Sequence, residues 1–205
     1  VFRDILDGCR YTGKNTVLWR LLVYYGLFFI LVAPAAILTP IMVERSYGGN
    51  VWRLTLNETL WVLGELLGGV IIALWGGFRN RLHSMSLATF CFGIGFALMG
   101  AVTNFWVYLI IIGLTGIFMP IFSTAETVLI QETVEESMLG RVFSIGNIIV
   151  SATMPLGMLL FGPLSDMVRI EGIMIVTGIL ITLLAPGILR ISRFLPKRET
   201  GEAEL

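Results

Sequence analysis

Long apolar runs dominate the hydrophobic pattern of this 205-residue chain, and short polar segments separate them. Each run is continuous over about 20 residues, whereas the strands of a membrane barrel alternate in polarity. A hydrocarbon core of about 30 Å takes roughly 20 helical residues to cross, and in lipid every backbone polar group needs an internal partner. The pattern therefore predicts an all-α membrane protein with six transmembrane helices. The expected spans cover residues 18–43, 54–77, 84–102, 104–128, 142–162 and 172–191.

Composition strengthens this prediction. Hydrophobic residues make up 56% of the chain and charged residues 14%, against about 25% charged residues in a typical soluble domain. The mean hydropathy is +0.87. The formal net charge is +0, and the basic residues form no face beyond what membrane topology needs. We therefore expect no nucleic-acid partner.

The distribution of Lys and Arg predicts the orientation in the membrane. If residue 1 lies in the cytoplasm, 11 of the 14 basic residues fall on the cytoplasmic side, and Arg45, Arg53 and Arg169 fall outside. This bias follows the positive-inside rule, so both termini are expected in the cytoplasm. The domain organisation then reads as a cytoplasmic amphipathic segment (residues 1–16), a six-helix bundle (17–192) and a cytoplasmic tail (193–205).

A weak internal repeat relates the two halves of the bundle. Gly76-x-x-x-Asn80 follows the second span and Gly162-x-x-x-Asp166 follows the fifth, each before a basic residue. The first turn would be cytoplasmic and the second external, as expected for two inverted repeats of three helices. The alternative is coincidence, because Gly, Asn and Asp are common turn formers.

The first of these turns resembles a known family motif. Gly76-x-x-x-Asn80-Arg81 is similar to the Gly-x-x-x-Asp-Arg turn between the second and third helices of a half of a major facilitator superfamily transporter. The run Trp-Gly-Gly-Phe-Arg-Asn-Arg at 75–81 is most like the macrolide-efflux branch of drug:proton antiporters. Asn80 stands where the family usually has Asp, which puts a charge-based latch at this turn in doubt.

A second segment supports the same resemblance. Gln131 to Ser144, with Gly140-Arg141-Val142 inside it, is similar to the family's Gln-x-x-Val-Pro-x-x-x-x-Gly-Arg-Val pattern before the eleventh helix, with Glu135 in place of Pro. The chain thus resembles the C-terminal half, helices 7–12, of such a transporter.

The resemblance implies a secondary active transporter that works by alternating access, with a cavity lined by helices 7, 8, 10 and 11 and with helices 9 and 12 facing lipid. It implies efflux of a small lipophilic substrate such as a macrolide, driven by the proton gradient without a cofactor. The expected location is the bacterial cytoplasmic (inner) membrane. The expected partners are membrane lipid and a missing N-terminal six-helix half.

Glu65 is the main candidate for proton coupling. It lies near the middle of the second span, where an ionised carboxylate costs about 2.5–3.5 kcal/mol on insertion scales, so burial favours its neutral form. A cationic drug would then compete with the proton at Glu65. Glu58, Trp61, Glu65 and Gly68 share one helical face, and Trp61 would stack on a cationic or aromatic substrate. The alternatives are a structural Glu65 bonded to a neighbouring helix and a Trp61 that only packs.

Two other spans carry candidate residues. Glu126, nearer the cytoplasmic end of the fourth span, either belongs to a vestibule or extends to the interface, and we favour the interface. Asn147 needs a hydrogen-bond partner in hydrocarbon, so its stripe on the fifth span faces either helices or the cavity. The stripe comprises Ser144, Asn147, Ser151 and Met154 or Pro155.

The turn formed by Gly76, Gly77, Arg79, Asn80 and Arg81 is a candidate gate that would cap a facing helix, or a simple topology anchor.

Two further motif pairs belong to the fifth span. Gly140 precedes Arg141, which would pair with a nearby Glu or with the turn. Gly162 and Asp166 would form the external counterpart turn, with Asp166 paired to Arg169.

Enzymatic and metal chemistry have little support. The chain has one histidine, His83, and no phosphate-binding Gly-x-x-x-x-Gly-Lys-(Ser/Thr) motif. Cys9 and Cys91 lack metal-ligand spacing. A lipid, lysophospholipid or metabolite carrier of the same superfamily is the alternative function. A non-transporting membrane assembly subunit is the alternative of another class.

Overall fold

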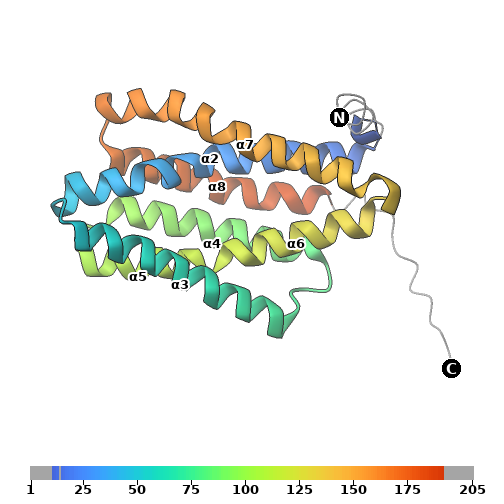
Figure 1. Ribbon diagram of the computed structural model, residues 1–205, viewed down its shortest axis with the longest axis horizontal. Helices are drawn as coiled ribbons and strands as arrows, with labels where there is room; N and C mark the ends of the chain where they lie inside the picture. The colour runs from blue at the N-terminus through green and yellow to red at the C-terminus, as the bar shows by residue number, and fades with distance from the viewer. Residues whose placement is uncertain (1–10, 14, 192–205) are drawn as a thin grey trace.

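The computed structural model describes residues 11–13 and 15–191, apart from the side chain of Met154. Most of the expected amphipathic segment and the whole tail at 193–205 lie outside the described residues. Within the described residues, seven helices form six apolar spans, arranged as in Figure 1, which confirms the predicted all-α, six-span fold. The helices are α2 (Thr16–Tyr47), α3 (Val51–Trp75), α4 (Arg81–Ala101), α5 (Phe105–Gly116), α6 (Phe118–Thr133), α7 (Glu136–Met167) and α8 (Ile170–Ile191).

Asparagine side chains begin three of these helices. Asn15 Oδ1 accepts from the backbone N–H of Val17 and Leu18, and Asn80 and Asn104 cap α4 and α5 in the same way. Each satisfies backbone donors that the first helical turn leaves without an intrahelical partner. Gly76 ends α3 in the left-handed region, at φ 73°, which a glycine adopts at little cost.

The fourth span is two helices rather than one. Helix α5 ends at Gly116 and α6 begins at Phe118. Pro120 lies in the first turn of α6, where its missing N–H would have no intrahelical partner in any case. The break stays inside a continuous apolar run, so the span still crosses as a unit.

The expected external turn at Gly162–Asp166 is wrong. These residues lie within α7, which continues to Met167. Pro163 removes the backbone donor for the Leu159 carbonyl, yet the helix continues through it. Ser165 Oγ donates to the Gly162 carbonyl (2.7 Å). The turn to α8 falls instead at Val168 and Arg169.

Helix α4 lies at the centre of the packing. It packs most extensively against α8, and it also contacts α5 and α6. Phe28 of α2 stacks on Phe122 of α6 at 4.2 Å between ring centroids, and it meets Phe92 of α4 at 5.8 Å. These three side chains are fully buried. The aromatic cluster therefore joins three helices that are distant in sequence.

Glycines set the closest helix contacts. A Cβ on Gly64 or Gly68 of α3 would collide with the carbonyl oxygens of Gly113 or Ile117. Small residues let backbones approach in this way in membranes. Gly64 and Gly68 therefore allow a close approach of α3 to the α5–α6 span, whereas Gly69 faces open space.

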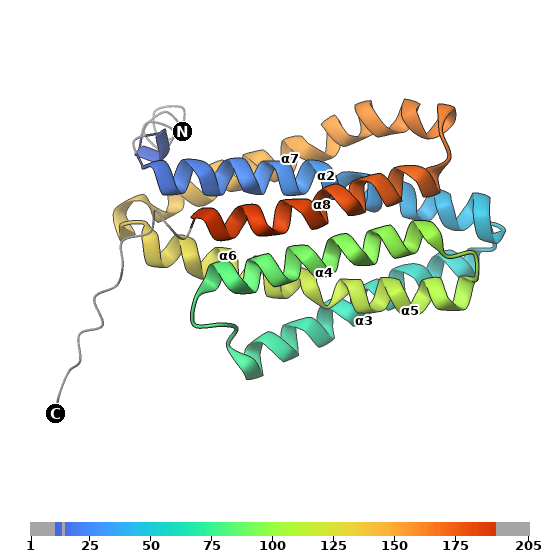
Figure 2. The same cartoon turned by 180° about the vertical axis from the view of Figure 1, so that it is seen from behind.

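The two ends of the bundle differ in charge. Helix α2 begins and α8 ends at one end (Figure 2), where Arg20, Arg79, Arg81, Arg141 and Arg190 lie; we call it the basic end. Among the described residues, the opposite end carries Arg45, Arg53 and Arg169.

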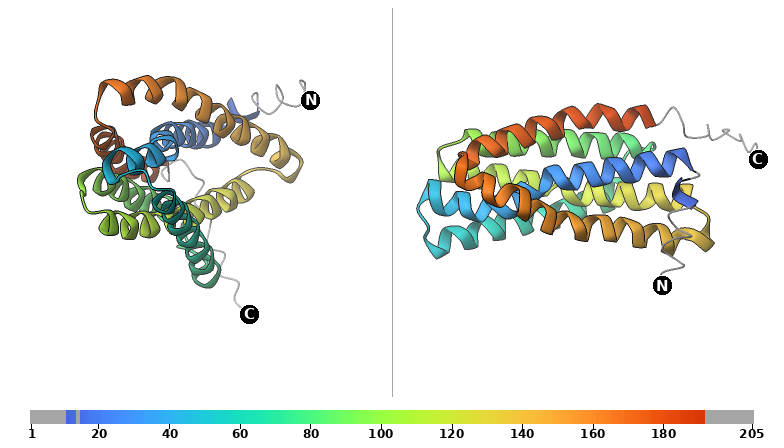
Figure 3. Two further views of the ribbon diagram at one scale, coloured as in Figure 1. Left: turned by 60° about the vertical axis from the view of Figure 1, so that its left-hand side comes forward. Right: turned by 90° about the horizontal axis from the view of Figure 1, so that it is seen from above.

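Helices α3 and α7 are the least buried spans, and they lie at opposite edges of the bundle (Figure 3). Their exposed faces combine apolar side chains such as Leu66 and Leu159 with polar ones such as Glu58, Thr59 and Asn147. The mid-span exposed residues of α4 and α8 are apolar, among them Phe90 and Leu183. This contrast suits lipid contact by α4 and α8 and a more polar neighbour for α3 and α7.

Candidate functional site

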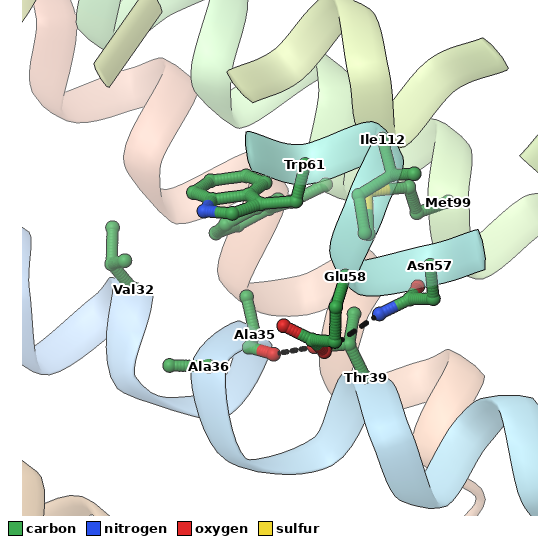
Figure 4. Close-up of a pocket in the computed structure, with 10 residues that line it drawn as sticks. Val32, Ala35, Ala36, Thr39, Asn57, Glu58, Trp61, Met99 and Ile112 are labelled. Carbon is green, nitrogen blue, oxygen red and sulfur yellow. Dashed lines mark hydrogen bonds between the residues drawn. The ribbon is translucent and has the colours of Figure 1, made fainter. Parts of the chain in front are cut away.

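A pocket of about 190 Å³ lies between α2, α3, α4 and α5, nearer the opposite end of the bundle (Figure 4). Apolar side chains make up most of its wall. The polar side chains among its lining residues are those of Thr39, Asn57, Glu58 and Trp61. The Thr39 hydroxyl donates to the Ala35 carbonyl of its own helix. Glu58 is the acidic residue among those that line the pocket.

A hydrogen-bonded chain holds the Glu58 carboxylate. Asn57 Nδ2 donates to Glu58 Oε1 (3.0 Å), and the Tyr108 hydroxyl donates to Asn57 Oδ1 (2.7 Å). Asn57 and Tyr108 are buried, whereas Glu58 is exposed. Because Tyr108 occupies the amide oxygen of Asn57, the amide nitrogen is the group that faces Glu58. The Glu58 side chain then points across the pocket towards Ala35 and Thr39 (Figure 4).

Trp61 connects the pocket to Glu65. Its ring meets Phe92 edge-on at 5.9 Å between centroids, and its side chain interacts with the Glu65 carboxyl one turn further along α3. The indole N–H is the polar group that the Trp61 side chain offers to this carboxyl. Glu65 itself does not line the pocket.

The predicted face of α3 therefore divides into three parts. Glu58 and Trp61 line the pocket, and Glu65 lies two turns from Glu58, about 10 Å along the helix and half-buried. Gly68 packs against Ile117 and has no part in the pocket.

Glu126 does not extend to the interface as we favoured from the sequence. Its side chain is buried in α6, at 7% exposure, and it interacts electrostatically with Tyr25 of α2. The expectation fails because α6 turns this face towards the bundle interior, where Ala125 and Leu129 are also buried. A buried carboxyl in a membrane span is a functional candidate by default.

The Asn147 stripe of α7 faces outwards. Ser144, Asn147, Ser151 and Pro155 are all exposed, and Ser144 Oγ donates to the Gly140 carbonyl one turn back (2.7 Å). Within the described residues, α7 packs mainly on α2. Of the two alternatives, packing of this stripe inside the bundle is wrong.

The predicted gate turn is tightly structured at the basic end. Gly76 and Gly77 both have positive φ, Asn80 caps α4, and Arg79 is exposed. Arg81 Nη1 donates to the Gly76 carbonyl (2.8 Å), so its guanidinium closes the turn.

An ion pair ties this turn to a second motif. Arg81 Nε lies 3.7 Å from Glu132 Oε1, at the end of α6. Both side chains are partly exposed, so the pair contributes little stability but sets the position of the turn. Gly140 is exposed near the start of α7, and the Arg141 guanidinium lies 3.4 Å from Met138 Sδ.

The expected Asp166–Arg169 pair is also wrong. Asp166 accepts from Arg45 Nη2 of α2 (3.1 Å), and Arg45 Nη1 donates to the Ser165 carbonyl (3.0 Å). Arg169 lies 3.6 Å from Glu171 instead. Because α7 stays helical to Met167, Asp166 projects towards α2 rather than along the next turn. These contacts join α2 to the end of α7.

Sequence reasoning missed the supports of the pocket carboxylate. Asn57 was a visible signal, because it is a polar residue inside an apolar span and lies one turn before Trp61. Tyr108 gave no comparable signal, since 51 residues separate it from its hydrogen-bond partner. Within residues 11–13 and 15–191, no group of three His, Cys, Asp or Glu side chains is placed to hold a metal ion.

These features define a multi-pass helical membrane protein with a partly polar pocket inside its bundle. Residues 21–204 match the Major Facilitator Superfamily, and the chain belongs to this family. The resemblance inferred from the two motifs is thereby confirmed.

Similar proteins agree with the predicted branch. Macrolide efflux protein A of Streptococcus pyogenes is 26% identical over 185 residues, which cover 89% of this chain and 46% of that protein. Macrolide efflux protein A of Enterococcus faecalis is 27% identical over 158 residues, covering 76% of this chain and 49% of that protein. The chain spans about half the length of the curated relatives it matches.

Proposed function

We propose that this chain is the C-terminal half of a proton-coupled exporter of lipophilic drugs, macrolides among them, that works by alternating access. The observation that carries the proposal is the pocket carboxylate of Glu58 beside Trp61, on an otherwise largely apolar wall. The family membership and the names of the relatives support the substrate class.

The pocket has the chemistry for an amphipathic cation. A carboxylate attracts a protonated amine, a Trp ring stacks on a cation or a flat apolar group, and the aliphatic wall takes up hydrocarbon. A partner half that covers the exposed faces of α3 and α7 would enlarge this pocket into a cavity.

Coupling to protons would use a second carboxyl. Glu65 interacts with Trp61, which also lines the pocket, so protonation of Glu65 would change the contacts of the same indole that faces the substrate. Glu126, buried across the bundle on α6, is a second candidate for proton binding. We therefore assign substrate binding to Glu58 and proton binding to Glu65.

The basic-end turn would act as a gate. Arg81 holds the Gly76 turn and reaches Glu132, so movement of α3 or α4 relative to α6 would break or form this contact. In the proposed topology the basic end is cytoplasmic, in a bacterial inner membrane, by the positive-inside rule.

The test is accumulation of drug in a macrolide-sensitive bacterium that expresses the full-length protein. A macrolide and a lipophilic cationic dye are each followed with and without a protonophore. Wild type is compared with Glu58→Gln and Glu65→Gln. Glu44→Gln, which changes an exposed carboxylate outside the pocket, is the matched control.

Wild type and Glu44→Gln should keep accumulation low until the protonophore is added. Glu58→Gln should raise accumulation of the dye, because it removes the attraction between the pocket carboxylate and the cationic dye. Glu65→Gln should abolish protonophore-sensitive export of both compounds. If expression changes the accumulation of neither compound, the proposed drug export is wrong. The alternative function, a lipid or metabolite carrier, is then favoured.

A further inference from the structure

A second concave surface lies between α2 and α8 at the basic end, outside the proposed transport site. These helices run side by side there (Figure 2), and they leave a groove of about 320 Å³. Arg20 of α2 and Arg190, in the last turn of α8, both line it. The groove thus has basic groups where it approaches the membrane surface.

One residue that lines the groove, Gly187, adds no side chain to it. A Cβ on Gly187 of α8 would meet nothing within 4 Å, so this position opens onto empty space. Tyr24 also lines the groove, but its hydroxyl donates to Thr89 Oγ1 of α4 (2.8 Å). The Tyr24 ring, not its polar atom, is therefore what the groove offers to a ligand.

The deeper part of the groove is apolar. Val23 and Leu27 line it from α2 and Leu184 from α8. Arg20 and Leu27 are seven residues apart, which is about 10 Å along a helix. That length is about a third of a hydrocarbon core, and it suits the first methylenes of an acyl chain whose headgroup lies beside Arg20.

Charge and position both favour an acidic lipid. Among the described residues that line the groove, none is acidic. Trp19, which also lines it, is 57% exposed, and exposed Trp side chains favour the level of the lipid headgroups. Basic pockets between helices on the cytoplasmic side recognise anionic headgroups.

We propose that the groove between α2 and α8 binds one acidic phospholipid, with its phosphate at the guanidinium groups of Arg20 and Arg190 and one acyl chain along Leu27 and Leu184. A zwitterionic lipid offers the same phosphate and chains, but its ammonium group lies close to both arginines and weakens the attraction. The bound lipid would join α2 to α8. This inference needs only the membrane fold and not the proposed drug export.

Native mass spectrometry of the delipidated full-length protein tests the inference with two probes, dioleoyl phosphatidylglycerol and dioleoyl phosphatidylethanolamine. The variants are Arg20→Gln with Arg190→Gln, which removes the charges, and Gly187→Leu, which fills the groove and keeps them. Gly172→Leu is the matched control for the second, because Gly172 also faces open space, at the other end of α8. Arg169→Gln controls for net charge.

Wild type should bind the phosphatidylglycerol more tightly than the phosphatidylethanolamine. The double arginine variant should weaken phosphatidylglycerol binding about 25-fold, from about fivefold for each charge removed. Gly187→Leu should weaken it at least as much, and both controls should bind as wild type does.

Equal binding of the two lipids by wild type would overturn the inference, and so would a Gly187→Leu variant that binds phosphatidylglycerol normally. Displacement of the lipid by inorganic phosphate alone would show a simple anion site and also overturn it. Wild-type selectivity decides the matter even if the arginine variants fail to fold, which a changed size-exclusion profile would reveal.

Discussion

Gly68 and Gly69 are adjacent in α3, but a Gly→Ala substitution would meet opposite surroundings at the two positions. A Cβ on Gly68 would collide with the Ile117 carbonyl oxygen and lie 2.8 and 2.9 Å from the carbonyl carbon and Cα of Ile117. A Cβ on Gly69 would meet nothing within 4 Å. We expect Gly68→Ala to destabilise the protein and Gly69→Ala to stabilise it.

The magnitude follows from two effects. Ala is favoured over Gly in a helix interior by about 1 kcal/mol, and this gain is common to both variants. At Gly68 the contacts must open by about half an ångström or more to reach ordinary carbon–carbon separations of about 3.5 Å. Overpacking of this kind costs about 1–3 kcal/mol. The two variants should therefore differ by about 1–3 kcal/mol.

The contact at Gly68 cannot relax at a side chain, because its atoms are the backbone of Ile117, the residue that joins α5 and α6. The assay is thermal unfolding of the full-length protein in detergent, with all three proteins purified identically. Gly68→Ala should unfold at a lower temperature than wild type, and Gly69→Ala at the same or a higher temperature. Equal midpoints for the two variants would refute the reasoning.

Two further predictions concern the pocket and the gate turn. Tyr108→Phe removes the hydroxyl that fixes the Asn57 amide. In vesicle transport the half-saturating concentration of a cationic substrate should rise about fivefold, which corresponds to the net contribution of one hydrogen bond. The half-saturating concentration of a neutral substrate should stay constant. Arg81→Gln loses the bonds to Gly76 and Glu132; the maximal transport rate should fall with little change in half-saturation, and an unchanged rate would exclude a gating role for this contact.

The spans were predictable because each is a continuous apolar run, and the observed helices depart from the expected ones by a few residues at most ends. Helix α7 was the largest exception. It begins at Glu136 and ends at Met167, because polar residues can extend a helix beyond the hydrocarbon where water satisfies them. The break at Ile117 was not predicted, because the residues directly on both sides of it are apolar.

The site was predictable only where one helix contains it. Glu58 and Trp61 share a face by helical spacing, and both line the pocket. The contacts that cross between helices, such as Tyr108 to Asn57 and Arg45 to Asp166, depend on which helices are neighbours. Sequence spacing carries no information on that choice, so the expected local pair of Asp166 with Arg169 was wrong.

The placement of polar groups in the spans argues for a second surface against α3 and α7. A polar group without a hydrogen-bond partner costs several kcal/mol in hydrocarbon, and the Glu58 carboxylate and the Asn147 amide are both exposed. The exposed mid-span residues of α4 and α8 are apolar, so these helices have no such need. Apolar side chains such as Leu66 and Leu159 are exposed on α3 and α7 as well, so the polar groups are what distinguishes these two helices. The cavity that we propose with a partner half would explain them, because water and substrate there would supply the hydrogen-bond partners that lipid lacks.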